Sequence, residues 1–176
     1  MKERCARLRA GMEAAGCDGF FSLSPPANEY LSGFTGTTSG LVITPDAAVF
    51  LCDFRYTEQA GEQVRDCEVR EVAGCLESRV GEALRDLGVK SAAYDDTAHT
   101  VWQLGKVCGN FQGEVKPDAG LVRNLRWVKS EEEVARIRAA AALVDGVLAE
   151  TVDSLRAGVT EREVAARMEY QFKARG

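Results

Sequence analysis

Apolar residues recur along this chain at two spacings, which predict helices and strands in alternation. The predicted helices are residues 2–15, a turn at 27–31, 56–63, 76–87, one carrying Val101, Leu104 and Cys108, and a short one after Asp118. The predicted strands are residues 18–23, 41–44, 48–52, 67–72, 89–94 and about 111–115. Residues 45–47 separate two apolar runs and predict a β-hairpin. The pattern therefore predicts an α/β domain with a mixed sheet and helices on its faces.

From Leu125 onward the pattern changes to two capped amphipathic helices. Ser130 with Glu133, and Thr160 with Glu163, have the spacing of a capping box, and Gly158 is expected to end the first helix. The apolar stripes are Val134, Ile137, Ala141, Val144, Leu148 and Leu155 in the first helix, and Val164, Met168 and Phe172 in the second. Such stripes need a covering partner. We therefore expect one domain over residues 1–124 and the start of a second, unfinished domain over 125–176.

Composition narrows the possible partners. The chain has 176 residues, 45% of them hydrophobic and 28% charged, with a net charge of −5. It contains no basic run, so we do not expect it to bind nucleic acid. No apolar run reaches the roughly 18–20 residues that span a bilayer, and the charged start does not resemble a secretory signal. We therefore expect a soluble cytoplasmic protein with no membrane partner.

Metal-binding and nucleophilic motifs are scarce in the sequence. The six cysteines include no Cys-x-x-Cys pair and are predicted to be free, mostly buried thiols. His99 is the single histidine, which excludes a motif with two histidine ligands, and we expect it to be solvated or to cap a helix. Asp95 and Asp96 are expected to cap the same helix. The sequence has no phosphate-binding, dinucleotide-binding or Gly-x-Ser-x-Gly pattern.

The densest polar cluster follows the second hairpin strand and contains Asp53, Arg55 and Tyr56. It is either a functional site or a structural one, and the spacing favours the structural interpretation. In that interpretation Asp53 caps the next helix, Arg55 pairs with a carboxylate, and Tyr56 packs its ring while its hydroxyl stays in water. The residues by themselves therefore predict a fold but no activity.

Four segments resemble the creatinase, prolidase and aminopeptidase P family. They are residues 28–36 (NEYLSGFTG), 53–60 (DFRYTEQA), 125–134 (LRWVKSEEEV) and 158–165 (GVTEREVA). Each motif has modest specificity, but their common order and spacing cover essentially the whole chain. Together they support assignment to this family.

The resemblance implies a two-domain metallopeptidase that hydrolyses peptide bonds preceding proline, as an Xaa-Pro aminopeptidase or dipeptidase. Residues 1–124 would be its ribonuclease H-like N-terminal domain, and 125–176 the first helices of its pita-bread catalytic domain. In the family, two divalent metal ions (manganese, cobalt or zinc) are held by two Asp, one His and two Glu. These motifs would lie beyond the end of this chain. The resemblance therefore implies a fragment without metal ligands, catalytic residues or activity.

The family's N-terminal domain commonly mediates dimerisation and reaches over the partner's active site. The resemblance therefore implies a homodimer, with candidate pocket-lining or interface residues Thr35, Thr37, Thr38, Ser39, Asp53, Arg55 and Tyr56. The last three are expected to be structural or interface residues rather than catalytic ones. The short, uncharged loop resembles aminopeptidase P-type members more than prolidases. Two alternatives remain open: a non-catalytic binding and dimerisation module of the same fold, and a creatinase-like amidinohydrolase.

Overall fold

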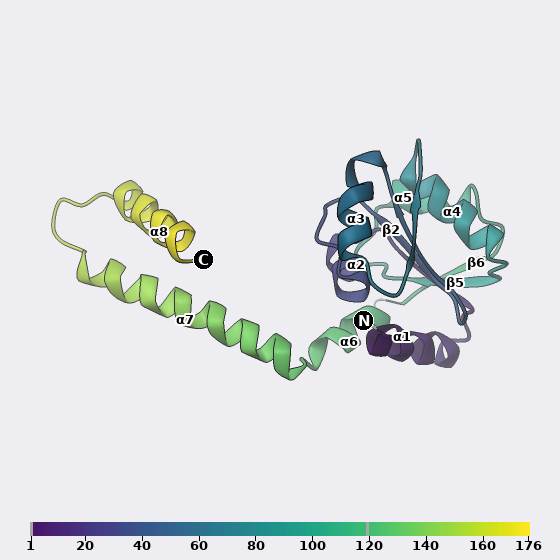
Figure 1. The fold of residues 1–176 in the computed structure, drawn as a ribbon, viewed down its shortest axis with the longest axis horizontal. Helices are drawn as coiled ribbons and strands as arrows, with labels where there is room; N and C mark the ends of the chain where they lie inside the picture. The colour runs from purple at the N-terminus through teal and green to yellow at the C-terminus, as the bar shows by residue number, and fades with distance from the viewer. Residues whose placement is uncertain (1, 119) are drawn as a thin grey trace. The chain divides into compact units, whose positions relative to one another are not determined.

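A computed structural model describes residues 2–118 and 120–176 (Figure 1). Two compact units divide the chain, the first ending at Trp127 and the second beginning at Val128. The helices of the first unit are α1 (Lys2–Ala14), α2 (Pro25–Ser32), the 3₁₀ turn η1 (Phe54–Tyr56), α3 (Thr57–Gln63), α4 (Leu76–Asp86), α5 (Val101–Cys108) and α6 (Gly120–Trp127). Its strands are β1 (Gly19–Ser22), β2 (Gly40–Ile43), β3 (Ala48–Cys52), β4 (Glu68–Glu71), β5 (Ser91–Tyr94) and β6 (Glu114–Pro117). The second unit consists of α7 (Glu131–Asp153) and α8 (Glu161–Arg175).

The first unit is built on one six-stranded sheet with the strand order β4-β3-β2-β1-β5-β6. Strand β2 runs antiparallel to both of its neighbours, whereas the other neighbouring pairs are parallel. In the β2–β3 hairpin, Leu41 lies opposite Phe50. The predicted hairpin and the mixed sheet are therefore confirmed.

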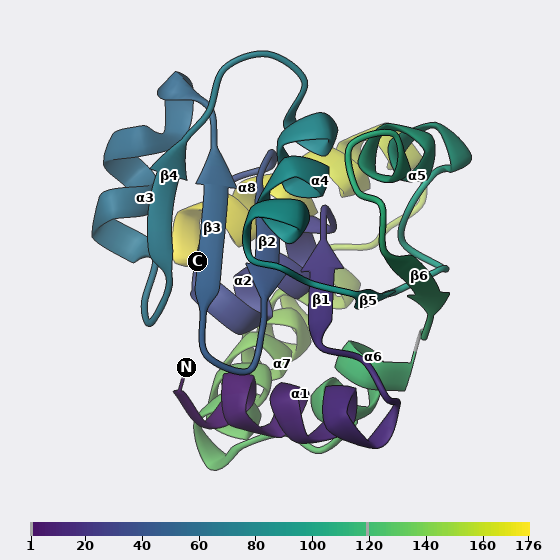
Figure 2. The ribbon, with the colours of Figure 1, turned by 90° about the vertical axis from the view of Figure 1, so that its right-hand side faces the viewer.

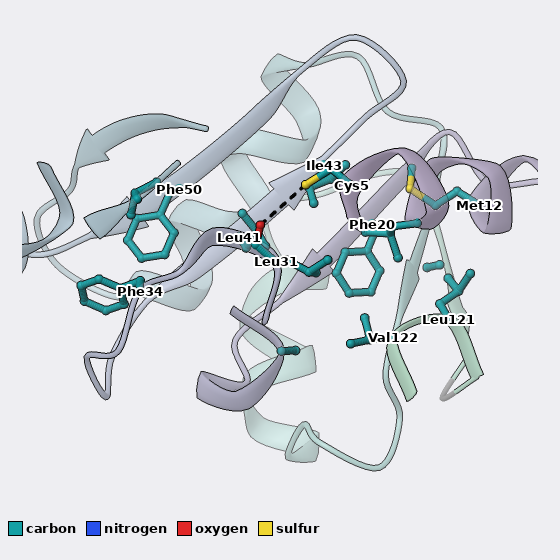
Figure 3. Packing of buried hydrophobic residues seen from close by; sticks show 14 of the residues in the cluster. Cys5, Met12, Phe20, Leu31, Phe34, Leu41, Ile43, Phe50, Leu121 and Val122 are labelled. Carbon is teal, nitrogen blue, oxygen red and sulfur yellow. Dashed lines mark hydrogen bonds between the residues drawn. The ribbon is translucent and has the colours of Figure 1, made fainter. Parts of the chain in front are cut away.

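Alternating side chains on the central strands form two hydrophobic clusters, one on each face of the sheet. Phe20 and Phe50 belong to the cluster covered by α1, α2, α3 and α6, which Figure 3 shows from close by. Phe21 and Val49 belong to the cluster covered by α4 and α5. Figure 2 shows α4 and α2 on opposite sides of the strands. Strands β1 and β2 are buried at every position because helices cover both of their faces.

The two edge strands differ in character from the central ones. In β4 and β6 the end residues are exposed and the middle residues are half-buried. Charged residues such as Glu68 and Lys116 lie on these edges, and β6 ends at Pro117. Short, charged, proline-ended edges discourage pairing with other strands.

The last strand lies further along the chain than the sequence predicted. It covers Glu114–Pro117 instead of residues 111–115. Phe111 is buried in the cluster under α4 and α5, and Gly113 crosses over its ring. A Cβ at Gly113 would lie 2.2 Å from the Phe111 Cζ atom and 2.6 Å from the Lys90 carbonyl oxygen. Because the Phe111 ring is buried in this cluster, the strand begins further along the chain, at Glu114.

The predicted cap of α5 at residues 95–97 is also wrong. Thr100 is the N-cap, and it forms a capping box with Gln103. Asp95 instead closes its own turn, where its Oδ1 accepts hydrogen bonds from the Thr97 amide and hydroxyl at 2.9 and 2.6 Å. The local turn occupies the carboxylate that the prediction assigned to the helix.

The second unit contains the two predicted helices. Capping boxes at Ser130 and Thr160 start α7 and α8, as expected. Helix α7 ends earlier than predicted, however, with Ser154 as its C-cap, so Gly158 lies in the connection with a φ of 91°. Val147 is fully buried within this unit. Most of the predicted α7 stripe is exposed, namely Ile137, Val144, Leu148 and Leu155.

Candidate functional site

The sheet brings the two candidate segments of the sequence together, at the ends of two neighbouring strands. The loop of residues 35–39 (the 35–39 loop) leads into β2, and Asp53 directly follows β3. Because β2 and β3 are antiparallel neighbours, with Gly40 opposite Leu51, the start of one strand lies beside the end of the other. The predicted residues from both segments therefore converge.

Asp53 and Arg55 form a closed pair on the first turn after β3. The Asp53 Oδ1 atom accepts the Arg55 backbone N–H at 3.0 Å, and so caps η1. The Arg55 guanidinium donates to both carboxylate oxygens at 2.7 to 3.2 Å. These hydrogen bonds hold the pKa of Asp53 below its ordinary value and raise the pKa of Arg55. This geometry agrees with the structural interpretation favoured by the spacing.

Tyr56 links the two segments directly. Its hydroxyl lies 2.8 Å from the Thr37 Oγ1 atom in an exposed contact, a partner that the sequence did not predict. Its ring packs edge-on against Phe34, with the centroids 5.6 Å apart. A Cβ at Gly36 would lie 2.3 Å from the Phe34 Cζ atom and 3.1 Å from the Tyr56 ring. The 35–39 loop therefore passes so close to both rings that only glycine fits at residue 36.

Helix α3 holds the first residue of the loop. The Gln63 Oε1 atom accepts the Thr35 backbone N–H at 3.0 Å and the Thr35 hydroxyl at 3.1 Å. The Gln59 Nε2 atom donates to the same Gln63 oxygen at 3.2 Å and to the Thr35 hydroxyl at 3.3 Å. Thr35 is exposed, but its polar groups are occupied by the helix.

The last residue of the loop points inward. Ser39 is buried, and its carbonyl and hydroxyl oxygens accept hydrogen bonds from Asn28 Nδ2 at 3.0 and 2.9 Å. Asn28 is itself fully buried in α2, and its Oδ1 atom has no hydrogen-bond partner among the described residues. Ser39 therefore anchors the loop to α2.

Sequence reasoning missed the residues that hold the loop and the aromatic residue next to the ion pair. Gln59 and Gln63 are one helical turn apart on the predicted helix 56–63, so their shared face could have been noticed. Asn28 begins the 28–36 segment that carries the family resemblance, but its role in holding Ser39 is set by the tertiary fold. Phe54 lies between Asp53 and Arg55, which bond to each other, and 76% of its surface is exposed.

His99 has a structural role rather than the solvated or capping role that the sequence suggested. Its Nε2 atom accepts the Leu23 backbone N–H at 3.0 Å, and its Nδ1 atom lies 2.7 Å from the Asp95 carbonyl oxygen. Only the neutral ring protonated on Nδ1 satisfies both contacts. The ring also packs edge-on against Phe21 and Tyr94. His99 therefore joins the end of β1 to the segment after β5.

Among the residues that the structure describes, the donor groups do not fit the dinuclear metal centre that the resemblance implies for the parent enzyme. Both nitrogens of His99 are engaged with the backbone, and the carboxylate of Asp53 is engaged by Arg55. Across residues 2–118 and 120–176, no three His, Cys, Asp or Glu side chains gather in a way that could hold a metal ion.

The cysteines behave mainly as small apolar residues. Those resolved as free thiols include Cys5, Cys17 and Cys52, which are buried, whereas Cys108 is exposed. Burial raises the pKa values of Cys5 and Cys52, and it raises that of Cys67 to about 12. Such thiols carry little thiolate at neutral pH and are poor nucleophiles. The cysteines are free thiols, as predicted, but only three of the six are buried, since Cys67 and Cys75 are half-buried.

In the part of the chain that the structure describes, no helix combines the length and apolar character needed to cross a bilayer.

The fold defines an α/β domain with a mixed sheet, followed by a helical pair. The chain belongs to the creatinase/prolidase N-terminal domain family, which matches residues 4–128. It is 30% identical over 171 residues to the uncharacterized peptidase YqhT of Bacillus subtilis, covering 97% of this chain and 48% of that protein.

Two solved structures extend the likeness beyond the sheet domain. The Xaa-Pro dipeptidase from Bacillus anthracis superimposes with a TM-score of 0.94 and 29% identity, covering 99% of this chain and 49% of that one. The X-Pro aminopeptidase from Thermotoga maritima gives a TM-score of 0.86 and 30% identity, covering 98% and 49%. The chain therefore spans about half the length of each of these three relatives.

Proposed function

We propose that this chain is the N-terminal half of an Xaa-Pro aminopeptidase or dipeptidase, a metal-dependent hydrolase of peptide bonds that precede proline. One observation carries the proposal. The fit to the Bacillus anthracis Xaa-Pro dipeptidase runs through 99% of this chain, including the helical pair, and covers 49% of that protein. A likeness confined to the sheet domain would favour a separate binding module instead.

In this proposal the chain contributes assembly and pocket lining rather than chemistry. It forms a homodimer through the sheet domain, and the 35–39 loop lines the active site of the partner subunit. Asp53, Arg55 and Tyr56 support this surface, since the first two are paired and Tyr56 bonds to Thr37. The cytoplasm is its compartment, in keeping with its free cysteines.

The chemistry belongs to the rest of the parent enzyme. Two divalent metal ions, manganese, cobalt or zinc, would be held there by the family's two Asp, one His and two Glu, and would supply Lewis-acid chemistry and an activated water. The metal ligands of the family are expected in that remaining part, so in this proposal the 176-residue chain is inactive by itself.

An assay with Xaa-Pro peptides tests the inactivity. The chain is incubated with Mn²⁺, Co²⁺ or Zn²⁺, and the release of the N-terminal residue is compared with that in metal alone. The expected rate equals that of free metal. Turnover above this background, abolished by a chelator, would contradict the absence of a centre in this chain.

Light scattering tests the proposed dimer. It is expected to give twice the chain mass at micromolar concentration, and a monomer at all concentrations would contradict the dimer.

The reading frame beyond Gly176 tests the proposed metal site. It is expected to encode the two Asp, one His and two Glu of the family's metal site. Their replacement by other residues would favour a non-catalytic binding protein.

A further inference from the structure

The 35–39 loop is attached to its surroundings along most of its length. Side chains from other elements bond to Thr35, Thr37 and Ser39, and two aromatic rings pack against Gly36. The residues that make these contacts are Gln63, Gln59, Tyr56, Phe34 and Asn28. A segment fixed at four of its five residues is a preformed surface rather than a mobile lid.

Gln63 is the central contact at the beginning of the loop. Its single Oε1 atom accepts three hydrogen bonds, from the Thr35 amide, the Thr35 hydroxyl and the Gln59 side chain. Every one of these contacts requires an acceptor at this position, and none requires the amide nitrogen of Gln63. A carboxylate oxygen would therefore serve equally, whereas a methyl group would release the loop.

The helix that carries Gln63 is itself fixed to the sheet. The Asp53–Arg55 pair closes the turn before it. The Thr57 hydroxyl donates to Glu71 Oε2 at 2.6 Å, which ties the first residue of α3 to the end of β4. Helix α3 therefore connects the loop to β3 and β4.

Thr38 is the exception within the loop. Its side chain is half-exposed, and no residue in the described ranges forms a hydrogen bond with it. Its neighbours Thr37 and Ser39 have their hydroxyls engaged by Tyr56 and Asn28. Among the four candidate residues of the loop, Thr38 is therefore the one with an unused hydroxyl.

We propose that Gln63, together with Gln59, is a positioning residue that holds the 35–39 loop in one conformation and leaves the Thr38 hydroxyl available to a ligand. The proposal rests on the proposed function, in which this loop lines a peptide-binding pocket. The loop has no charged residue, and the nearby Arg55 is neutralised by Asp53. The ligand group that suits Thr38 is therefore an uncharged one, such as the main-chain amide or carbonyl of a peptide.

Amide hydrogen exchange of the full chain tests this inference. The exchange rates of residues 35–39 are measured in the unaltered chain and in Gln63→Ala, Gln63→Glu and Thr38→Ala, relative to the amides of β1 and β2. Loss of one ordinary hydrogen bond changes an equilibrium roughly five- to tenfold. We expect exchange at Thr35 to accelerate by about that factor in Gln63→Ala. Gln63→Glu and Thr38→Ala are expected to stay within about twofold of the unaltered chain, the former because its carboxylate preserves the acceptor.

Two results would overturn the inference. Unchanged exchange at Thr35 in Gln63→Ala would show that the loop does not depend on this residue. Equal acceleration in Thr38→Ala would show that Thr38 holds the loop instead of being free. If Gln63→Ala perturbs the sheet amides as well, Thr35→Val gives a second test, because it removes the hydroxyl that donates to Gln63 and accepts from Gln59 while leaving Gln63 in place; unchanged exchange of the loop in this variant would contradict the inference. These results do not depend on dimerisation or peptidase activity, so failure here is distinct from failure of the proposed function.

Discussion

The sheet domain ends at Trp127, and the helical pair begins at Val128. Helices in both units begin with capping boxes, but the two units differ in how much of the apolar face of a helix is buried. Capping boxes begin α5 in the first unit and α7 and α8 in the second. In the first unit Val80 and Leu84 of α4 are fully buried against the sheet. In the second, Ile137 and Leu148 of α7 are 54% and 50% exposed.

The difference separates two sources of helix stability. A cap determines where a helix begins and contributes about 1 kcal/mol. Burial of an apolar face contributes far more, because each fully buried large side chain is worth about 1.5–3 kcal/mol. The first unit has both contributions, whereas much of the apolar surface of the second remains in water.

The largest expected effect is the loss of a ring from the sheet core. Phe50 is fully buried, with its ring centroid 4.8 Å from that of Phe34. Phe50→Ala removes these contacts and leaves a cavity, so we expect it to lower the free energy of unfolding by about 3–5 kcal/mol. Denaturant unfolding followed by Trp fluorescence measures this change.

Leu148→Ala is the matched substitution in the helical pair. Half of the Leu148 side chain is exposed, so we expect a change below about 0.5 kcal/mol. A cost for Leu148→Ala comparable with that of Phe50→Ala would remove the contrast between the units.

A smaller effect is expected at His99 in the first unit. His99→Ala leaves the Leu23 amide, in a buried residue, without its acceptor, and removes a ring that packs against Phe21. An unsatisfied buried donor costs about 1–3 kcal/mol, and thermal unfolding measures the loss. Trp102→Ala, on an exposed side chain of α5, serves as control. Equal stability of the two variants would show that the hydrogen bond from Leu23 to His99 does not stabilise the fold.

Removal of a cap is expected to affect the helical pair more selectively. In Ser130→Ala, the Glu133 amide loses the hydroxyl acceptor that lies 3.2 Å away. We expect a loss of about 0.5–2 kcal/mol in the stability of α7, visible as faster amide exchange in its first turn. Exchange in the strands is expected to be unchanged. A uniform acceleration across both units would contradict this prediction, because it would show that the cap also affects the strands.

The smallest effect concerns pH. Hydrogen bonds from the Thr160 backbone and hydroxyl lower the pKa of Glu163. Because the folded-state pKa is depressed, this contribution is complete above the ordinary glutamate pKa and is lost as the pH falls through the lower value. We expect α8 to fray on acidification, as measured by amide exchange in its first turn. In Glu163→Gln, we expect the fraying of α8 to depend less steeply on pH. Identical pH profiles of this variant and the unaltered chain would refute the role of the carboxylate.

Much of this architecture could be predicted from periodicity. The hairpin, the central strands and the tail helices with their caps follow from spacings within a few residues. The errors arise where a distant partner intervenes: Phe111 is buried and delays β6, and Leu23 engages His99. The fold brings the candidate residues of the two segments together near Asp53, but the roles of Gln63 and Asn28 depend on a loop that the fold places beside them. Local sequence does not encode such contacts.

Truncation after Lys129 tests the central claim most directly, namely that the sheet domain is complete without the helical pair. Calorimetry of the shortened chain is expected to give a melting temperature within about 2 °C of that of the sheet domain in the full chain. A drop as large as that caused by Phe50→Ala would show that the helical pair belongs to the core of the first unit, and would contradict the account.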